Sequence, residues 1–191
     1  MRQALARQLA LVAKWNRAYN LTSVRDPADM IARHVLDSAA ALPFLRGRRM
    51  LDAGSGAGFP GIVLALLAPD TRWTLVEANG KKARFLRHAV RYLDLAGRVS
   101  VAQERLEDHH RPAAAFDTIT ARALSDLATL ARWTTPLLAP GGRLVALKGR
   151  RGPIESECAA LSSDWRADVV AVKVPDLAAE RHIVVLERTA T

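Results

Sequence analysis

The stretch that most constrains the fold of this chain runs from Met50 to Ile62 and reads MLDAGSGAGFPGI. Four of its residues are glycines within a span of eight, directly after a short apolar run and before an apolar helical segment. Glycine permits tight turns and lets a backbone approach a ligand closely. Gly56, Gly58 and Gly61 also have the G-x-G-x-x-G spacing, which alone is of low specificity. Because this spacing lies between an expected strand and an expected helix, it predicts a ligand-binding loop. A turn whose glycines only allow the helix to pack on the strand stays an alternative.

The remaining pattern predicts a doubly wound α/β fold. After Gly47, short apolar runs alternate with helical segments, as in a parallel sheet covered on both faces. We expect strands at 48–53, 72–78, 98–103, 116–123, 141–149, 167–174 and 181–188, with helices near 60, 80–95, 104–110, 125–138 and 153–163. Only PDLAAE joins the last two strands, which leaves no room for a crossover helix, so the last strand should run antiparallel. Helices at 2–19 and 27–45 precede this pattern. We therefore expect a single domain over 1–191, with an N-terminal helical cap (1–46) and a Rossmann-like core (47–191).

Composition narrows the classes of function. The 191 residues carry a formal net charge of +9, which favours a polyanionic partner. No apolar run approaches the ~20 residues that a membrane span needs. A single cysteine, Cys158, excludes an internal disulfide and suits a reducing cytoplasm. His109 and His110 follow no metal-ligand spacing, so we expect no metal site.

Two acidic residues distinguish the candidate ligands of the glycine loop. Glu77 ends the next expected strand, where a carboxylate can accept hydrogen bonds from a ribose diol. Asp52 stands two residues before Gly54, and a carboxylate there would repel a dinucleotide pyrophosphate. S-adenosyl-L-methionine instead brings a sulfonium and an ammonium cation. The pattern D-x-G-x-G-x-G followed by a strand-terminal acid thus favours S-adenosylmethionine over a dinucleotide.

Several further stretches carry a resemblance to known proteins. The glycine loop resembles the first motif of the class I S-adenosylmethionine-dependent methyltransferases, whose seven-stranded sheet ends in an antiparallel strand, and LAPGGRL (138–144) resembles another of their signatures. The chain also contains, in order, WNRAYNLTSVRDP (15–27), RHVLDS (33–38), GSGAGFPGI (54–62), KKARFL (81–86), TARA (120–123), LKG (147–149) and ERH (180–182). Together these resemble the RsmG (GidB) family, which methylates N7 of a guanosine in the 530 loop of bacterial 16S ribosomal RNA. Thr120 stands where a serine is common in that family.

The loop pattern and the resemblance together imply a set of cofactor-binding residues. Those expected around the loop and at the end of the second strand are Asp52, Gly54, Ser55, Gly56, Gly58, Phe59 and Glu77. The resemblance adds Arg105, Leu106 and Glu107 around the adenine, and Arg122 at the end of the fourth strand. Arg122 suits the methionine carboxylate or a phosphate, or else a structural pair with an acid such as Asp126.

The implied chemistry makes few demands on the protein. Guanine N7 has an in-plane lone pair and no hydrogen, so its in-line attack on the methyl group needs no general base, and we assign no residue a certain catalytic role. Lys148 is placed to reach guanine O6 or a phosphate. Arg181, His182 and His34 are further substrate-positioning candidates, although His34, Asp37 and Ser38 also fit a polar knot that ties the cap to the core.

We therefore expect a cytoplasmic, monomeric enzyme that acts on 16S ribosomal RNA or the small ribosomal subunit. Two alternatives stay open: a methyltransferase of a small molecule, and an RNA-binding module without turnover.

Overall fold

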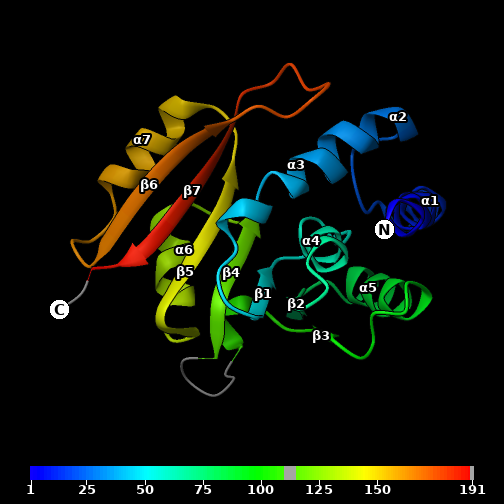
Figure 1. The fold of residues 1–191 in the computed structure, drawn as a ribbon, viewed down its shortest axis with the longest axis horizontal. Coiled ribbons are helices and arrows are strands. Elements are labelled where there is room, and N and C mark those ends of the chain that lie inside the picture. Colours follow the sequence, from blue (N-terminus) through cyan, green and yellow to red (C-terminus); the bar gives the residue numbers. More distant parts are fainter. Residues whose placement is uncertain (110–114, 190–191) are drawn as a thin grey trace.

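One seven-stranded sheet organises the protein in the computed structural model, which describes residues 1–109 and 115–189. The strand order is β3-β2-β1-β4-β5-β7-β6 (Figure 1). The strands are β1 (Arg49–Ala53), β2 (Arg72–Val76), β3 (Val99–Ala102), β4 (Phe116–Arg122), β5 (Leu138–Lys148), β6 (Trp165–Val172) and β7 (Arg181–Arg188). All seven predicted strands are thus present, with ends shifted by up to three residues.

Strand directions divide the sheet into two parts. β1 pairs in parallel with both β2 and β4, and the parallel pairing continues to β3 on one side and to β5 on the other. β7 lies antiparallel between β5 and β6. This arrangement confirms the predicted mostly parallel sheet with an antiparallel last strand.

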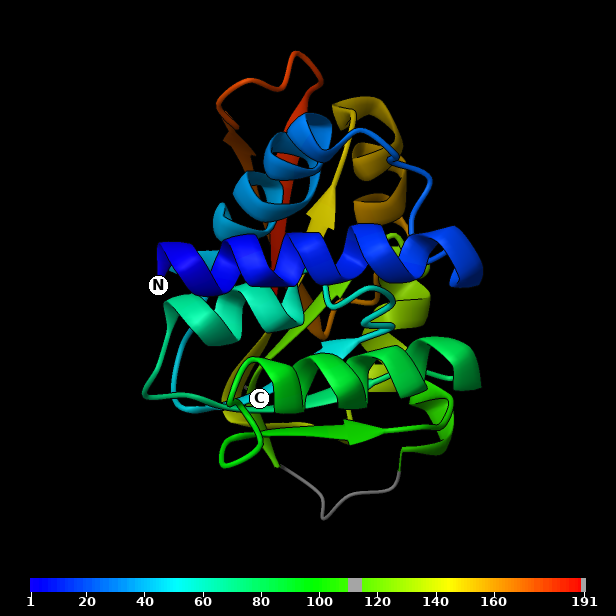
Figure 2. The same ribbon diagram turned by 90° about the vertical axis from the view of Figure 1, so that its right-hand side faces the viewer.

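Helices cover both faces of the sheet. Among the described residues, the α-helices of at least seven residues are α1 (Arg2–Tyr19), α4 (Gly61–Leu67), α5 (Gly80–Tyr92), α6 (Leu127–Thr134) and α7 (Arg151–Ala159). Met50, Trp73 and Val145 point to the face covered by α1, α4 and α5, whereas Leu51 and Ile119 point to the face covered by α6 and α7. Figure 2 shows α1 lying across α4 and α5. The alternation of side chains along each strand accounts for the two cores.

The second predicted helix is broken into pieces. Residues 27–45 form α2 (Pro27–Met30), a π-helical segment η1 (Ile31–Leu36), α3 (Asp37–Ala39) and a 3₁₀ turn η2 (Leu42–Phe44). The start is as expected, because Pro27 occupies the first turn and Asp26 caps Ala28 N–H at 2.8 Å. Pro43 explains the early end, since a proline ring does not fit an α-helix interior.

The predicted helix at 104–110 is only a 3₁₀ turn, η3 (Leu106–Asp108), and residue 110 lies outside the described residues. Across the described residues, no helix combines the length and the apolar character needed to cross a membrane.

Candidate functional site

The glycine loop leaves the carboxyl end of β1 in a backbone conformation that needs glycine. Gly54 has φ of 67° and Gly58 has φ of 86°, both in the left-handed region. A Cβ at Gly54 would also lie 2.8 Å from Leu124 Cδ1. Ser55 N–H donates to Val76 O at 3.0 Å, so the loop crosses the end of β2. The sequence-predicted loop residues are therefore together at the carboxyl edge of the central strands, where open α/β sheets bind ligands.

Glu77 lies directly after β2 and holds this loop. Its Oε2 accepts the Gly56 N–H and its Oε1 accepts the Asn79 N–H, both at 2.8 Å. An ionised carboxylate offers about four acceptor positions, so each oxygen keeps capacity for another donor. A ribose diol would supply two such donors. The carboxylate and the left-handed loop thus fit an adenosine-containing cofactor.

Asp52 precedes the loop and lies inside the protein core. Its side chain is fully buried, at 0% exposure. Its Oδ2 accepts the Gly61 N–H at 3.1 Å and its Oδ1 accepts the Thr120 hydroxyl at 2.8 Å. Because Asp52 shares the face of β1 with Met50, its carboxylate points beneath α4. Asp52 therefore joins β1, β4 and α4, and burial raises its pKa to about 6.

The predicted adenine segment follows β3, next to Glu77. Glu77 N–H donates to Ala102 O at 3.0 Å, which brings the residues after β3 close to the ribose candidate. Leu106 is buried, whereas Arg105 and Glu107 are exposed and form an ion pair at 3.5 Å.

Phe59 links the loop to the cap. Its ring stacks on the His34 imidazole, with centroids 4.5 Å apart, and the Arg122 guanidinium lies 5.6 Å from the ring centroid. His34 Nδ1 contacts Arg33 O at 3.0 Å, and Nε2 contacts Thr22 Oγ1 at 2.8 Å. Burial, followed by the charge of Arg122, lowers the pKa of His34 to about 4. The neutral imidazole is therefore the form present at neutral pH.

A cavity of about 470 Å³ opens between the cap and the carboxyl ends of β4 and β5. Its lining includes four basic side chains and one carboxylate, namely Arg33, Arg122, Lys148, Arg181 and Asp37. Arg122 pairs with Asp37 at 3.1 Å, whereas Asp126 caps Thr129 N–H at 2.9 Å. The structure thus gives Arg122 an acidic partner, but from the cap and not from α6.

The other predicted substrate-side residues meet at the same cavity edge. Lys148 and His182 are register partners on β5 and β7. Lys148 Nζ donates to Glu157 Oε2 at 2.6 Å and to Ser125 O at 3.0 Å. His182 is buried and its Nδ1 contacts Gly149 O at 2.7 Å. His182 therefore supports the turn after β5, while Lys148 and Arg181 line the cavity itself.

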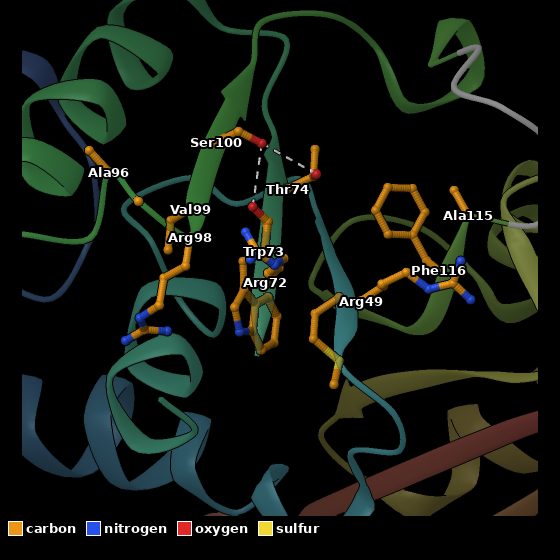
Figure 3. A pocket seen from close by; sticks show the side chains of 12 residues that line it. Arg49, Arg72, Trp73, Thr74, Ala96, Arg98, Val99, Ser100, Ala115 and Phe116 are labelled. Carbon is orange, nitrogen blue, oxygen red and sulfur yellow. Dashed lines mark hydrogen bonds between the residues drawn. The ribbon is translucent and has the colours of Figure 1, made fainter. Parts of the chain in front are cut away.

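A second hollow, of about 330 Å³, lies at the opposite end of the sheet. Figure 3 shows Arg49, Arg72 and Arg98 around it, with Thr74 and Ser100 joined across β2 and β3. Arg49 and Arg72 are the first residues of β1 and β2, so this hollow lies at the amino ends of the strands. The glycine loop and the predicted site residues are not part of it.

Two contributors were not assigned to the site from sequence. Gln8 of α1 is fully buried and its Nε2 donates to Ala57 O at 3.1 Å, which fixes the loop from the cap side. The sequence indicates Asp37 only as part of a polar knot, although the motif RHVLDS contains it. The knot exists in a different form, because His34 bonds Thr22 while Asp37 bonds Arg122 and Arg181.

In the described residues, no group of three His, Cys, Asp or Glu side chains could hold a metal ion. His109 is buried and contacts Glu104 at 2.5 Å, and His110 lies outside the described residues.

Comparison with solved structures supports the fold. The tRNA methyltransferase TrmI from Aquifex aeolicus matches with a TM-score of 0.67 at 15% identity, over 82% of this chain and 69% of TrmI. Geranyl diphosphate methyltransferase, solved with GPP and the S-adenosylmethionine analogue sinefungin, matches with a TM-score of 0.62 at 14% identity, over 79% of this chain and 77% of that chain. The predicted class I methyltransferase fold is confirmed.

Comparison with sequences identifies the family. The model of the GidB family, described as rRNA small subunit methyltransferase G, matches residues 1–184. The ribosomal RNA small subunit methyltransferase G of Xanthomonas euvesicatoria pv. vesicatoria (strain 85-10) is 49% identical over 185 residues, which is 96% of this chain and 85% of that protein. S-adenosylmethionine, the predicted cofactor, is confirmed as the methyl donor. The chain belongs to the GidB family of rRNA small subunit methyltransferases.

Proposed function

We propose that the protein transfers a methyl group from S-adenosylmethionine to N7 of a guanosine in the 530 loop of bacterial 16S ribosomal RNA, by in-line attack without a general base. The observation that carries this proposal is the cavity lined by Arg33, Arg122, Lys148 and Arg181, beside the glycine loop. A polyanionic acceptor explains such a concentration of cations. The names of the relatives, which specify ribosomal RNA of the small subunit, support the same acceptor.

The chemistry of guanine N7 matches what the side chains offer. S-adenosylmethionine supplies the methyl group on a cationic sulfur, and N7 carries no proton that must be removed. His34 has both ring nitrogens engaged, with Arg33 O and Thr22 Oγ1. The work of the protein is then to hold the acceptor and donor in position, an effect worth up to ~7–11 kcal/mol.

Recognition of the guanine must leave N7 free. The usual bidentate grip of arginine on guanine uses O6 together with N7 and is therefore unsuitable here. Lys148 Nζ uses two of its three N–H donors on Glu157 and Ser125, so one donor is left for guanine O6 or a phosphate. We assign Lys148 this positioning role. We further propose that the protein acts as a monomer in the cytoplasm, on the small ribosomal subunit or its RNA.

Methyl transfer to defined acceptors tests the proposal. The purified protein would be incubated with methyl-labelled S-adenosylmethionine and small ribosomal subunits that lack the modification, beside matched subunits that already carry it. We expect label in 16S RNA from the unmodified particles only. Label in a small metabolite but not in RNA would support a small-molecule methyltransferase. RNA binding without any transfer would support a non-catalytic module, and either result would refute the proposal.

A further inference from the structure

We propose that three arginines at the amino ends of β1, β2 and β3 form a second RNA-contact site, which binds backbone phosphates of the ribosomal RNA away from the glycine loop. Arg49, Arg72 and Arg98 line the second hollow (Figure 3). This inference rests on the proposed function, because it takes the RNA acceptor from there. The surface shares no residue with the lining of the basic cavity.

The three arginines form one row across neighbouring strands. Arg49 and Arg72 are register partners in the parallel pairing of β1 with β2. Trp73 is the register partner of Val99, so Arg98, one residue before β3, lies opposite Arg72. Trp73 N–H donates to Arg98 O at 2.8 Å, which extends the pairing to this residue. Because neighbouring strands lie about 4.8 Å apart, the sheet itself spaces the backbone of three cationic residues closely.

The row lies on the sheet face that α6 and α7 cover at β4 and β5. Val76 of β2 packs into that core, and Arg72 and Thr74 share its face because side chains alternate along a strand. In the part of the chain that the structure describes, this face stays accessible near β3, where Ser100 is exposed and Thr74 is half-buried. Their hydroxyl oxygens lie 3.4 Å apart and add polar groups to the lining.

The positive charge of the row is only partly compensated. Arg49 pairs with Asp117 at 2.7 Å, and Arg98 Nη1 donates to Thr71 O at 3.4 Å. Within residues 1–109 and 115–189, the Arg72 guanidinium has no hydrogen-bond or ion-pair partner, and the lining of the hollow includes no carboxylate. Like charges on opposed residues repel each other. An anion bound along the row would relieve this repulsion and use the free guanidinium donors.

The length of the row and its place in the fold favour a nucleic-acid backbone over a single small anion. At ~3.3 Å per residue, the five residues of β1 separate the row from the glycine loop by about 17 Å. An RNA backbone carries a phosphate on every nucleotide, so one RNA can contact both ends of the sheet. Phosphate contacts fix the position of a nucleic acid without reading its sequence. We therefore assign the row a role in orienting the ribosomal RNA.

The double variant Arg72→Gln, Arg98→Gln tests this site through its affinity for unmodified small subunits. Each lost phosphate contact lowers the slope of log K against log salt by about 0.7–0.9, so two should lower it by about 1.4–1.8. The loss of affinity should then be about tenfold larger at about 50 mM than at about 200 mM salt. The kcat at saturating subunits and the binding of S-adenosylhomocysteine should not change, because neither arginine lines the basic cavity.

The double variant Arg2→Gln, Arg132→Gln is the matched control. It removes the same charge from α1 and α6, and neither residue lines the second hollow. We expect this control to keep the wild-type salt slope. An equal change of slope in both double variants would show a general effect of net charge, and no change in either would show no contact. Each result would refute the site.

Further variants separate charge from folding. Arg72→Lys with Arg98→Lys keeps both charges and should keep the wild-type slope, whereas the slope of the glutamine variant would contradict a phosphate contact. The glutamine variant should unfold at no lower temperature than wild type, because it removes like charges that face each other. If it does not fold, Arg72→Gln alone carries the test, with a slope lowered by about 0.7–0.9.

Inorganic phosphate tests the other source of the anion. Calorimetric binding of phosphate to the wild type and not to the glutamine variant, with equal affinity of both for small subunits, would overturn the assignment to RNA. Methylation of another atom or of a small molecule would refute the proposed function and leave the salt slopes as the measure of this site. Equal slopes together with methylation at guanine N7 would refute this site alone.

Discussion

At the scale of single residues, burial changes the pKa values of two side chains near the glycine loop. Asp52 and His34 both lie within reach of the glycine loop, and burial shifts their pKa values in opposite directions. Burial favours the neutral form in each case, which raises the pKa of an acid and lowers that of a base. Neither side chain therefore carries a full charge over the whole range near neutrality, and the positive charges that line the cavity come from Arg33, Arg122, Lys148 and Arg181.

We predict a titration midpoint of about 4 for His34, measured by NMR of the imidazole resonances. Because the folded pKa lies below the ordinary 6.5, the neutral ring contributes stability that is complete above about pH 6.5 and is lost as the pH falls toward 4. Arg33 O can only accept, so Nδ1 should carry the proton of the neutral ring. A midpoint near 6.5 would show that the ring is not enclosed between Phe59 and Thr22.

The contribution of Asp52 to stability should depend on pH in the opposite direction to that of His34. Its folded pKa of about 6 exceeds the ordinary 3.8, so the folded protein binds the proton more tightly. The contribution of the carboxyl to stability is then greatest below pH 3.8 and decreases as the pH rises to about 6. The difference in unfolding free energy between wild type and Asp52→Asn should fall by roughly 1–3 kcal/mol over that range. Denaturant unfolding at several pH values measures this difference, and a flat difference would contradict the burial of the charge.

At the level of strands and helices, the close packing of α4 on β1 and β2 is the feature that positions the loop. A Cβ at Gly61 would lie 2.5 Å from Asp52 Oδ2 and 2.6 Å from Leu75 Cδ2. Gly61, the third glycine of the G-x-G-x-x-G spacing, therefore has a role in packing, while Gly54 and Gly58 provide the left-handed backbone.

We predict that Gly61→Ala destabilises the protein by about 1–3 kcal/mol, the usual cost of overpacking a core. Gly152, in α7, has no neighbour within 4 Å of a built Cβ and provides the control. Gly152→Ala should be neutral or stabilising by up to about 1 kcal/mol, because alanine loses less conformational entropy on folding. Equal effects in thermal or denaturant unfolding would contradict the close contact at Gly61.

The elements differ in how well sequence predicts them. The strands were predictable because their apolar runs are short and bounded, and the missing crossover between 174 and 181 predicted the antiparallel β7. The division of residues 27–45 into four short segments was not predictable from the sequence. Apolar periodicity does not distinguish a continuous α-helix from one that is interrupted by a π-helical segment. The Asp37 network was not predictable either, because its arginines lie 85 and 144 residues away in sequence.

Over the whole molecule, the glycine loop and the basic cavity lie over different strands at one edge of the sheet. The glycine loop and Glu77 lie over β1 and β2, whereas the basic cavity lies over β4, β5 and β7. The formal net charge of +9 was a general indication of a polyanionic partner, and the structure places four basic side chains around one cavity. Sequence spacing predicts that an acid precedes the loop, whereas the burial of Asp52 and its bonds to Gly61 and Thr120 are visible only in the structure.

Identification of the methylated atom in the small subunit tests this account most directly. Small subunits that lack the modification would be treated with the protein and S-adenosylmethionine, and the RNA would be digested and its labelled nucleoside and sequence position determined. The account predicts 7-methylguanosine at one guanosine of the 530 loop and no other labelled nucleoside. Label on another atom or another base, or in no RNA at all, would contradict it.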